Sequence, residues 1–216
     1  MLLNARELFH YSAVASDGPA GAVRDLLVDD KNWSVRYIVV DTEGLLSDNH
    51  VVLSSTLVKG VRPLDQELEF ALSKSEMADS SPASLSPPVS AHHNEPETLA
   101  GAEHDPHLRS AVEIGECTVF ASDGELGRAH GLVVEVATWR VRYFVVDTGE
   151  LLSSQQVLLA PIVIRNIDWD SRKVTTNLTV NAVHECPVYD RESEITRQYE
   201  AFLHSYYGWH PYWQAD

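Results

Sequence analysis

The sequence has few basic residues, only two cysteines and no long hydrophobic run. Its 216 residues contain 16 Lys and Arg against 32 Asp and Glu, a formal net charge of −16. Nucleic-acid binding depends on Lys and Arg that neutralise phosphates, so this balance excludes nucleic acid from the expected partners. The same charge is repelled by anionic lipid surfaces and is compatible with basic protein partners.

A membrane-spanning helix is not predicted, because no stretch approaches the about 18 consecutive apolar residues that such a helix needs. The apolar start at Met1 is interrupted by Arg6 and Glu7, which makes it too short for a secretory signal. We therefore expect a soluble, cytoplasmic protein. Cys117 and Cys186 are too few for a disulfide framework, and we expect both to be free, buried thiols.

An internal repeat is the main signal in the sequence. When the chain is shifted by 106 residues, 20 of the 39 positions between residues 15 and 53 are identical, without a gap. The shared residues include a Ser-Asp-Gly turn, a Trp-x-Val-Arg-Tyr-x-Val-Val-Asp-Thr segment and a Leu-Leu-Ser segment. The sequence therefore predicts two copies of one domain. We call residues 106 positions apart counterparts.

The domain boundaries follow from changes in composition. We assign residues 1–79 and 110–188 to the two copies. Residues 80–109 are rich in Pro, Ser, His and acidic residues, a composition that cannot bury enough apolar surface to fold, and they are predicted to form a flexible linker. Residues 189–216 form a tail without a counterpart in the first copy.

Each copy has the pattern of a small β-domain. Asp17 and Gly18, like their counterparts Asp123 and Gly124, are typical of a tight turn. Residues 33–42 are rich in β-branched and aromatic side chains and are apolar on both faces, as in a central strand. Several short strands with tight turns predict a mainly β fold of two small β-barrels, joined by the linker and followed by a C-terminal helix.

The pattern resembles the PRC-barrel domain, a family named after the photosynthetic reaction-centre H subunit and also found in a ribosome maturation factor. The resemblance rests on the Ser-Asp-Gly turn, the Trp-x-Val-Arg-Tyr strand and, in the second copy, the segments at residues 157–161, 178–179 and 185–187. It implies a non-catalytic module without a cofactor that binds other proteins or assembles with itself in a bacterial cytosol. An accessory protein of a photosynthetic reaction-centre complex is an alternative.

Aromatic and Arg residues are the candidate interface in both copies. They cover the barrel rim or anchor a partner, and they also allow intramolecular barrel–barrel pairing or a homodimer. In the copies they are Trp33, Arg36, Tyr37, Trp139, Arg142 and Tyr143.

The tail holds eight of the chain's 18 aromatic residues. Residues 192–206 predict an amphipathic helix, whose apolar face covers one of the chain's own barrels or contacts a partner, another copy or a membrane surface. The candidate interface residues here are Tyr199, Phe202, Tyr206, Trp209 and Trp213.

Catalytic or metal chemistry has weaker support. Asp41 and Asp147 could be an acid–base pair, but the expected role of each is to pair with Arg36 or Arg142, or with backbone donors of the next turn. A metal-dependent sensor or enzyme is an alternative because four histidines lie in the linker, yet they lack a rigid element that would fix ligands. They are His92, His93, His104 and His107. We assign no catalytic, cofactor-binding or metal-binding residue.

Overall fold

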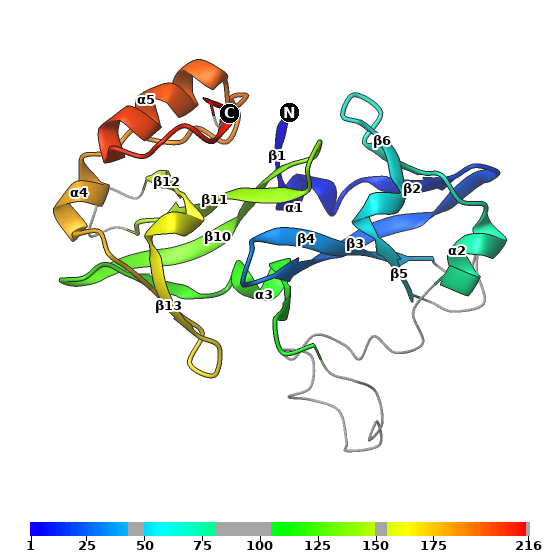
Figure 1. The fold of residues 1–216 in the computed structure, drawn as a ribbon, viewed down its shortest axis with the longest axis horizontal. Helices are drawn as coiled ribbons and strands as arrows, with labels where there is room; N and C mark the ends of the chain where they lie inside the picture. Colours follow the sequence, from blue (N-terminus) through cyan, green and yellow to red (C-terminus); the bar gives the residue numbers. More distant parts are fainter. Residues whose placement is uncertain (43–49, 81–104, 150–154, 215–216) are drawn as a thin grey trace. The chain divides into compact units, whose positions relative to one another are not determined.

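The computed structural model describes residues 1–42, 50–80, 105–149 and 155–214, and it is mainly β, as the sequence predicts (Figure 1). The strands are β1 (Leu2–Asn4), β2 (Ser12–Ala15), β3 (Gly18–Asp29), β4 (Ser34–Asp41), β5 (His50–Ser54), β6 (Val58–Arg62), β7 (Glu67–Phe70), β8 (Leu108–Ser110), β9 (Thr118–Phe120), β10 (Glu125–Glu135), β11 (Arg140–Asp147), β12 (Gln156–Leu159), β13 (Ile164–Asp168) and β14 (Lys173–Thr176).

The helices are short except for the last. They are α1 (Ala5–Leu8), α2 (Lys74–Ser80), α3 (Ala111–Ile114), α4 (Val180–His184) and α5 (Arg197–Tyr207), with 3₁₀ turns η1 (Ser55–Leu57), η4 (Pro161–Val163) and η5 (Tyr212–Gln214). In the part of the chain that the structure describes, no helix is long and apolar enough to cross a membrane.

Counterpart elements have the same neighbours in the sheet. Antiparallel pairs join β2 to β3, β3 to β4 and β4 to β5, and a parallel pair joins β2 to β7. The matching strands of the second copy pair as β9 to β10, β11 to β12 and, in parallel, β14 to β9. All described strands belong to one fourteen-stranded sheet with the order β13-β14-β9-β10-β11-β4-β3-β2-β7-β6 along its main path.

Two glycines fix the path of the longest strands. Gly21 in β3 and Gly127 in β10 have φ of 136° and 144°, a backbone region that L side chains rarely adopt. A Cβ atom on either residue would lie 2.0 Å from a backbone oxygen, that of Asp41 or Asp147 respectively. The glycine that both copies share at this position is therefore required by a close backbone approach.

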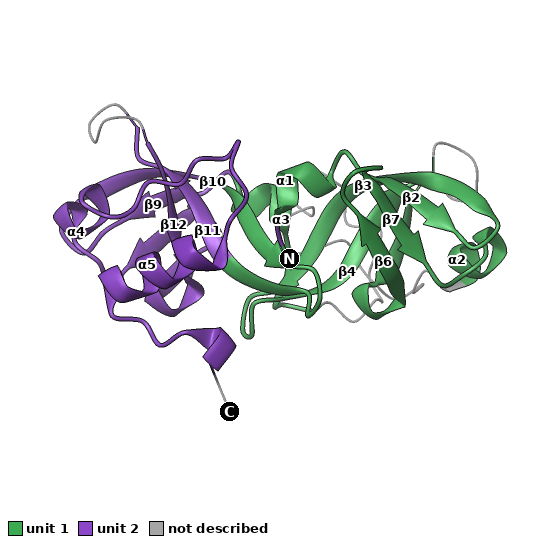
Figure 2. Ribbon diagram, turned by 90° about the horizontal axis from the view of Figure 1, so that it is seen from above, with its two compact units in different colours: residues 1, 3–115, 131–142 green, residues 2, 116–130, 143–216 purple. Residues whose placement is uncertain are grey.

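The chain divides into two compact units, which do not follow the sequence copies (Figure 2). Unit 1 contains residues 1, 3–115 and 131–142, and unit 2 contains residues 2, 116–130 and 143–216. Both β10 and β11 cross this division, so the tip of the second hairpin belongs to unit 1 together with the first copy.

The strand β8 begins inside the range 80–109 that the sequence assigned to the linker and ends at Ser110, the first residue of the second copy. Leu108 in this strand is buried, and β8 pairs with β3 through Leu27 and Ser110. The Pro- and acid-rich composition hid this short strand, because only its pairing with a distant segment buries it. Residues 81–104, which make up most of the predicted linker, lie outside the described residues.

Alternating side chains of the central strands form the cores. In unit 1 the fully buried residues include Leu26, Ile38, Leu53 and Phe70, which come from β3, β4, β5 and β7. In unit 2 Phe144 and Leu159 take the counterpart places of Ile38 and Leu53. Cys117 and Cys186 are buried thiols outside any disulfide bond, as predicted.

Candidate functional site

The arginine of the Val-Arg-Tyr segment pairs with an acid on the preceding strand in both copies. Arg142 Nη2 lies 2.5 Å from Glu135 Oε2, and the counterpart Arg36 Nη1 lies 3.8 Å from Asp29 Oδ2. The sequence predicted that Asp41 and Asp147 pair with these arginines or with backbone donors of the next turn, and each arginine instead has the acid across the hairpin turn as a partner. The hairpin register brings the end of one strand opposite the start of the next, so the acid across the turn is nearer than the acid at the strand's far end.

The two strand-end aspartates have local roles. Asp147 Oδ1 accepts a hydrogen bond from the backbone N–H of Gly149 at 3.0 Å, which is the turn contact that the sequence predicted. Asp41 Oδ2 lies 3.9 Å from Arg24 Nε and 4.0 Å from His50 Nε2. These contacts hold a turn in unit 2 and a strand edge in unit 1.

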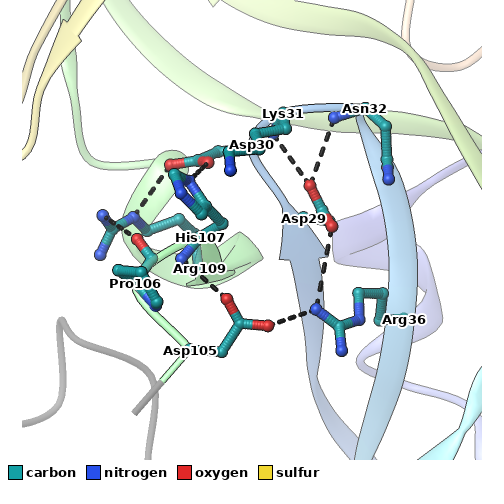
Figure 3. A network of polar contacts seen from close by, with 9 residues as sticks. All are labelled: Asp29, Asp30, Lys31, Asn32, Arg36, Asp105, Pro106, His107 and Arg109. Carbon is teal, nitrogen blue, oxygen red and sulfur yellow. Dashed lines mark hydrogen bonds and ion pairs between the residues drawn. The ribbon is translucent and has the colours of Figure 1, made fainter.

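A polar network in unit 1 fixes the chain where it enters β8 (Figure 3). Asp30 Oδ2 accepts a hydrogen bond from Arg109 Nε at 3.2 Å, and Asp30 Oδ1 lies 2.9 Å from His107 Nδ1. Asp105 binds Arg36, and hydrogen bonding from the backbone N–H of His107 lowers the pKa of its carboxyl. The candidate interface residue Arg36 is therefore partly engaged in anchoring residues 105–109.

The linker histidines do not form a metal site among the described residues. His107 contacts Asp30, while His92, His93 and His104 lie outside the described residues. Within the described part of the chain, no group of three or more His, Cys, Asp or Glu residues is arranged to hold a metal ion.

Asp25 is the acid whose burial has the clearest electrostatic consequence. Its carboxylate accepts hydrogen bonds from Ser110 Oγ and from the backbone N–H groups of Val112 at 3.2 Å and Leu26 at 2.7 Å. Burial nevertheless raises the pKa of the Asp25 carboxyl to about 6, because desolvation outweighs these hydrogen bonds. Its counterpart is Gly131, so the second copy lacks this group.

The raised pKa of Asp25 predicts a pH-dependent stability. The folded state binds the proton more tightly than the unfolded state, so the contribution of Asp25 is favourable below its unfolded pKa near 3.8 and is lost as the pH rises through about 6. Between pH 4 and pH 7 this loss amounts to about 2 kcal/mol. We expect Asp25→Asn to reduce this decline, measured as the free energy of unfolding in urea at a series of pH values.

Asp65→Asn is the control for this experiment, since Asp65 is exposed. Comparing each variant with the wild-type chain removes the background from the other carboxylates. If Asp25→Asn and the wild-type chain showed the same pH dependence, the carboxyl of Asp25 would not be the group responsible.

Trp33 and Trp139 occupy the tips of the two hairpins rather than the strands themselves. Both have positive φ, 55° and 53°, which is rare for a bulky residue. The backbone N–H of Val35 donates to Trp139 O at 2.7 Å, and that of Val141 donates to Trp33 O at 2.8 Å. Trp139 is buried and Trp33 is half-buried, so this pair joins the hairpin tips within unit 1.

An open pocket of about 770 Å³ lies in unit 1 beside these hairpin tips. Four segments surround it: the start of β4, the β5–η1 corner, β6, and the tip of the β10–β11 hairpin, together with the first residue. Its lining is Met1, Ser34, Val35, Arg36, Tyr37, Ser54, Ser55, Thr56, Val58, Lys59, Gly60, Val61, Val136, Ala137, Thr138 and Trp139.

The lining of the pocket differs in charge from the chain as a whole. It contains Arg36 and Lys59 and no Asp or Glu, although acids outnumber bases two to one in the sequence. Most of the remaining polar groups are hydroxyls, including that of Tyr37. Arg36 is already paired with Asp29 and Asp105, so the pocket offers the Lys59 cation and several hydrogen-bond donors. These groups suit an occupant that carries carboxylates or other anionic groups.

The counterpart of Tyr37 lies in a closed environment in unit 2. Tyr143 is 0% exposed, and its hydroxyl donates to Glu200 Oε1 at 2.8 Å and lies 2.9 Å from His204 Nε2. Glu200 and His204 come from α5, which lies beside β11 and β12 in both views (Figures 1 and 2). The C-terminal tail thus covers Tyr143.

The buried carboxylate of Glu200 is the centre of this cluster. Its Oε1 also accepts from the Tyr212 hydroxyl at 2.8 Å, and Arg197 Nη1 lies 2.8 Å from its Oε2. Burial raises the pKa of Tyr143 above its usual range and lowers the pKa of His204. These tyrosines therefore remain protonated donors to a carboxylate, an arrangement that stabilises the docked tail.

The helix α5 begins five residues later than predicted. Thr196 is its N-cap and accepts from the Tyr199 N–H at 3.2 Å, while Asp190 holds the preceding residues in a turn. Its buried face is formed by Glu200, Leu203 and His204, whereas Phe202 is 62% exposed.

The other predicted tail residues are spread around this helix. Tyr199 donates to Pro187 O at 3.3 Å, and Tyr206, which is exposed, donates to Ala182 O at 2.8 Å. Trp209 and Trp213 lie against the His204 ring, with centroid separations of 5.6 and 4.8 Å. Hydrophobic spacing did not identify Glu200 and His204 as buried residues of the helix, because both are polar. Glu200 and His204 nevertheless share one helical face with Leu203 and Tyr207. A helical spacing that counts polar residues as well as apolar ones would have identified them.

Comparisons with known proteins do not assign the chain to a family: no protein-family model matches it, and no curated protein matches it. The resemblance to PRC-barrel domains therefore stays a prediction from the sequence pattern.

Proposed function

We propose that the chain is a non-catalytic, protein-binding module of the PRC-barrel type, a tandem pair of small barrels that acts in a bacterial cytosol without a cofactor. The repeated Trp-x-Val-Arg-Tyr pattern and the matching strand neighbours of the two copies support the tandem-barrel part of this proposal.

The pocket in unit 1 is the observation that carries the binding function. It is open, it is large enough for several side chains of a partner, and its lining combines cations with hydroxyls. The shared aspartates hold turns and strand edges instead of facing this pocket. Groups with these positions favour recognition of a partner over chemistry on a substrate.

Charge reversal at Lys59 tests this proposal. Lys59 is exposed and lines the pocket, so Lys59→Glu changes the binding surface and leaves the core intact. We expect affinity purification from cells of the native host to recover one or more proteins with the wild-type chain and to lose them with Lys59→Glu, as read by mass spectrometry.

Lys31→Glu is the matched control, because Lys31 is an exposed lysine of the same unit outside the pocket lining. It should retain the proteins that the wild-type chain retains. Recovery of the same proteins by the wild-type chain and Lys59→Glu, or recovery of none by the wild-type chain, would contradict the proposal.

A further inference from the structure

We propose that one face of β4 and β5 in unit 1, on which Tyr37 and Ser54 line the pocket, binds an amphipathic helix of a partner protein, with a carboxylate of that helix accepting a hydrogen bond from Tyr37. This inference rests on the proposed binding function and specifies the chemistry of the partner. It starts from a difference between two matched sheet faces.

The two copies have a matching sheet face, on β4 and β5 in unit 1 and on β11 and β12 in unit 2. Side chains alternate along a strand, so Tyr37 and Val39 of β4 share a face, and the paired residues Ser54 and Val52 of β5 lie on the same side. Their counterparts in unit 2 come from β11 and β12, where Val145 pairs with Leu158 in the same register.

The two matching faces differ in how far their side chains are buried. The counterparts Tyr143, Val145 and Leu158 are 0% exposed, and Ala160 is 8% exposed. All four residues of the first face are only half-buried. The residue types are similar, since Tyr37 repeats Tyr143 and Val39 repeats Val145, so the sheet itself does not explain the contrast.

In unit 2 the C-terminal tail covers the Tyr143 hydroxyl. The helix α5 supplies Glu200 and His204 to the Tyr143 hydroxyl, and Val188, just before the tail, pairs with Val157 of β12. The first copy has no counterpart of this tail in the sequence. An amphipathic helix is therefore the cover that this kind of face accepts. The described elements of unit 1 include no helix at the place of α5, and we take the occupant to be a helix of another chain.

The charge of the pocket lining indicates which helix it would bind. Glu200 meets the tyrosine hydroxyl in unit 2. The pocket beside Tyr37 is lined by Lys59 and by Arg36, which is paired with Asp29 and Asp105, and it has no acidic lining residue. Because opposite charge fixes the register of an interface, a helix with one or more carboxylates on its buried face is favoured.

The chain's own tail supplies a probe for this chemistry. We would use a synthetic peptide of residues 188–216, held helical by a side-chain cross-link between positions 201 and 205, both of which are exposed in α5. The cross-link removes the cost of folding a short isolated helix. Binding to the full chain would be measured by fluorescence anisotropy and by titration calorimetry.

We expect one peptide to bind per chain, with affinity at least tenfold weaker for Lys59→Glu and unchanged for Lys31→Glu. The same peptide carrying Glu200→Gln should also bind at least tenfold more weakly. Exchange with the resident tail in unit 2 would give binding that Lys59→Glu does not alter, and that result would overturn the inference.

Three further outcomes distinguish the failure of the inference from the failure of the proposed function. Lys59-dependent recovery of cellular proteins together with no peptide binding would overturn the helix chemistry and leave the binding function in place. A dimer of the chain in sedimentation that Lys59→Glu dissociates would assign the face to a second copy and would also overturn the inference. Loss of both the cellular proteins and the peptide signal would contradict both proposals.

Discussion

Gly21→Ala and Gly127→Ala are each expected to destabilise the chain by about 4 kcal/mol or more, a large fraction of the stability of a typical domain. Two costs combine at these positions. The backbone has φ near 140°, where an L side chain is strained by about 1–3 kcal/mol. The added Cβ would also lie 2.0 Å from a carbonyl oxygen of the neighbouring strand. Urea unfolding followed by circular dichroism measures the effect.

Gly208→Ala separates these two costs. Gly208 ends α5 with a φ of 67°, and a Cβ there would meet no atom within 4 Å. Its replacement should therefore cost only the left-handed strain of about 1–2 kcal/mol. If Gly21→Ala were no more destabilising than Gly208→Ala, the close approach to Asp41 would not be the reason that both copies have glycine.

Features that depend on neighbouring residues could be predicted from the sequence. The β-branched and aromatic run at residues 33–42 contains β4. The thiols lie outside any disulfide bond, and the tail forms a helix. In each case the signal is a local periodicity or a turn residue, which acts within one element.

Features that depend on distant segments could not be predicted. Leu108 is buried only because β8 pairs with β3, some eighty residues earlier in the chain. The partner of Arg36 follows from the hairpin register, and the pocket combines four separate segments. The hydrophobic pattern of a segment does not show which distant segment it contacts. Leu108 was therefore predicted to lie in a linker, because the residues around it are rich in Pro and acidic residues.

The covered face of unit 2 shows how a polar residue can direct the docking of an amphipathic helix. Glu200 is a charged residue at the centre of the buried face of α5, a position that hydrophobic spacing would reserve for an apolar side chain. Its carboxylate accepts hydrogen bonds from two tyrosines and pairs with Arg197, so its burial is compensated. Such a group favours one orientation of the helix, because only that orientation brings the carboxylate to the donors.

Removing this carboxylate is expected to release much of that stabilisation. Glu200→Ala leaves the Tyr143 and Tyr212 hydroxyls without their shared acceptor and should lower the free energy of unfolding by about 3 kcal/mol. Glu194→Ala, at an exposed position that precedes the helix, should change it by less than about 0.5 kcal/mol. Both values come from urea unfolding of the full chain, with limited proteolysis reporting whether the tail is released first.

The tyrosine counterparts give an independent measurement of the same contact. Tyr143→Phe removes a buried hydroxyl that donates to a charged acceptor, a loss of about 2 kcal/mol. Tyr37→Phe removes the counterpart hydroxyl from a half-buried position at the open pocket and should cost less than about 0.5 kcal/mol. Equal losses from the two variants would show that the docked tail does not distinguish these faces. A larger loss from Tyr143→Phe ties the difference to Glu200 and predicts that a bound carboxylate-bearing helix would make Tyr37→Phe costly as well.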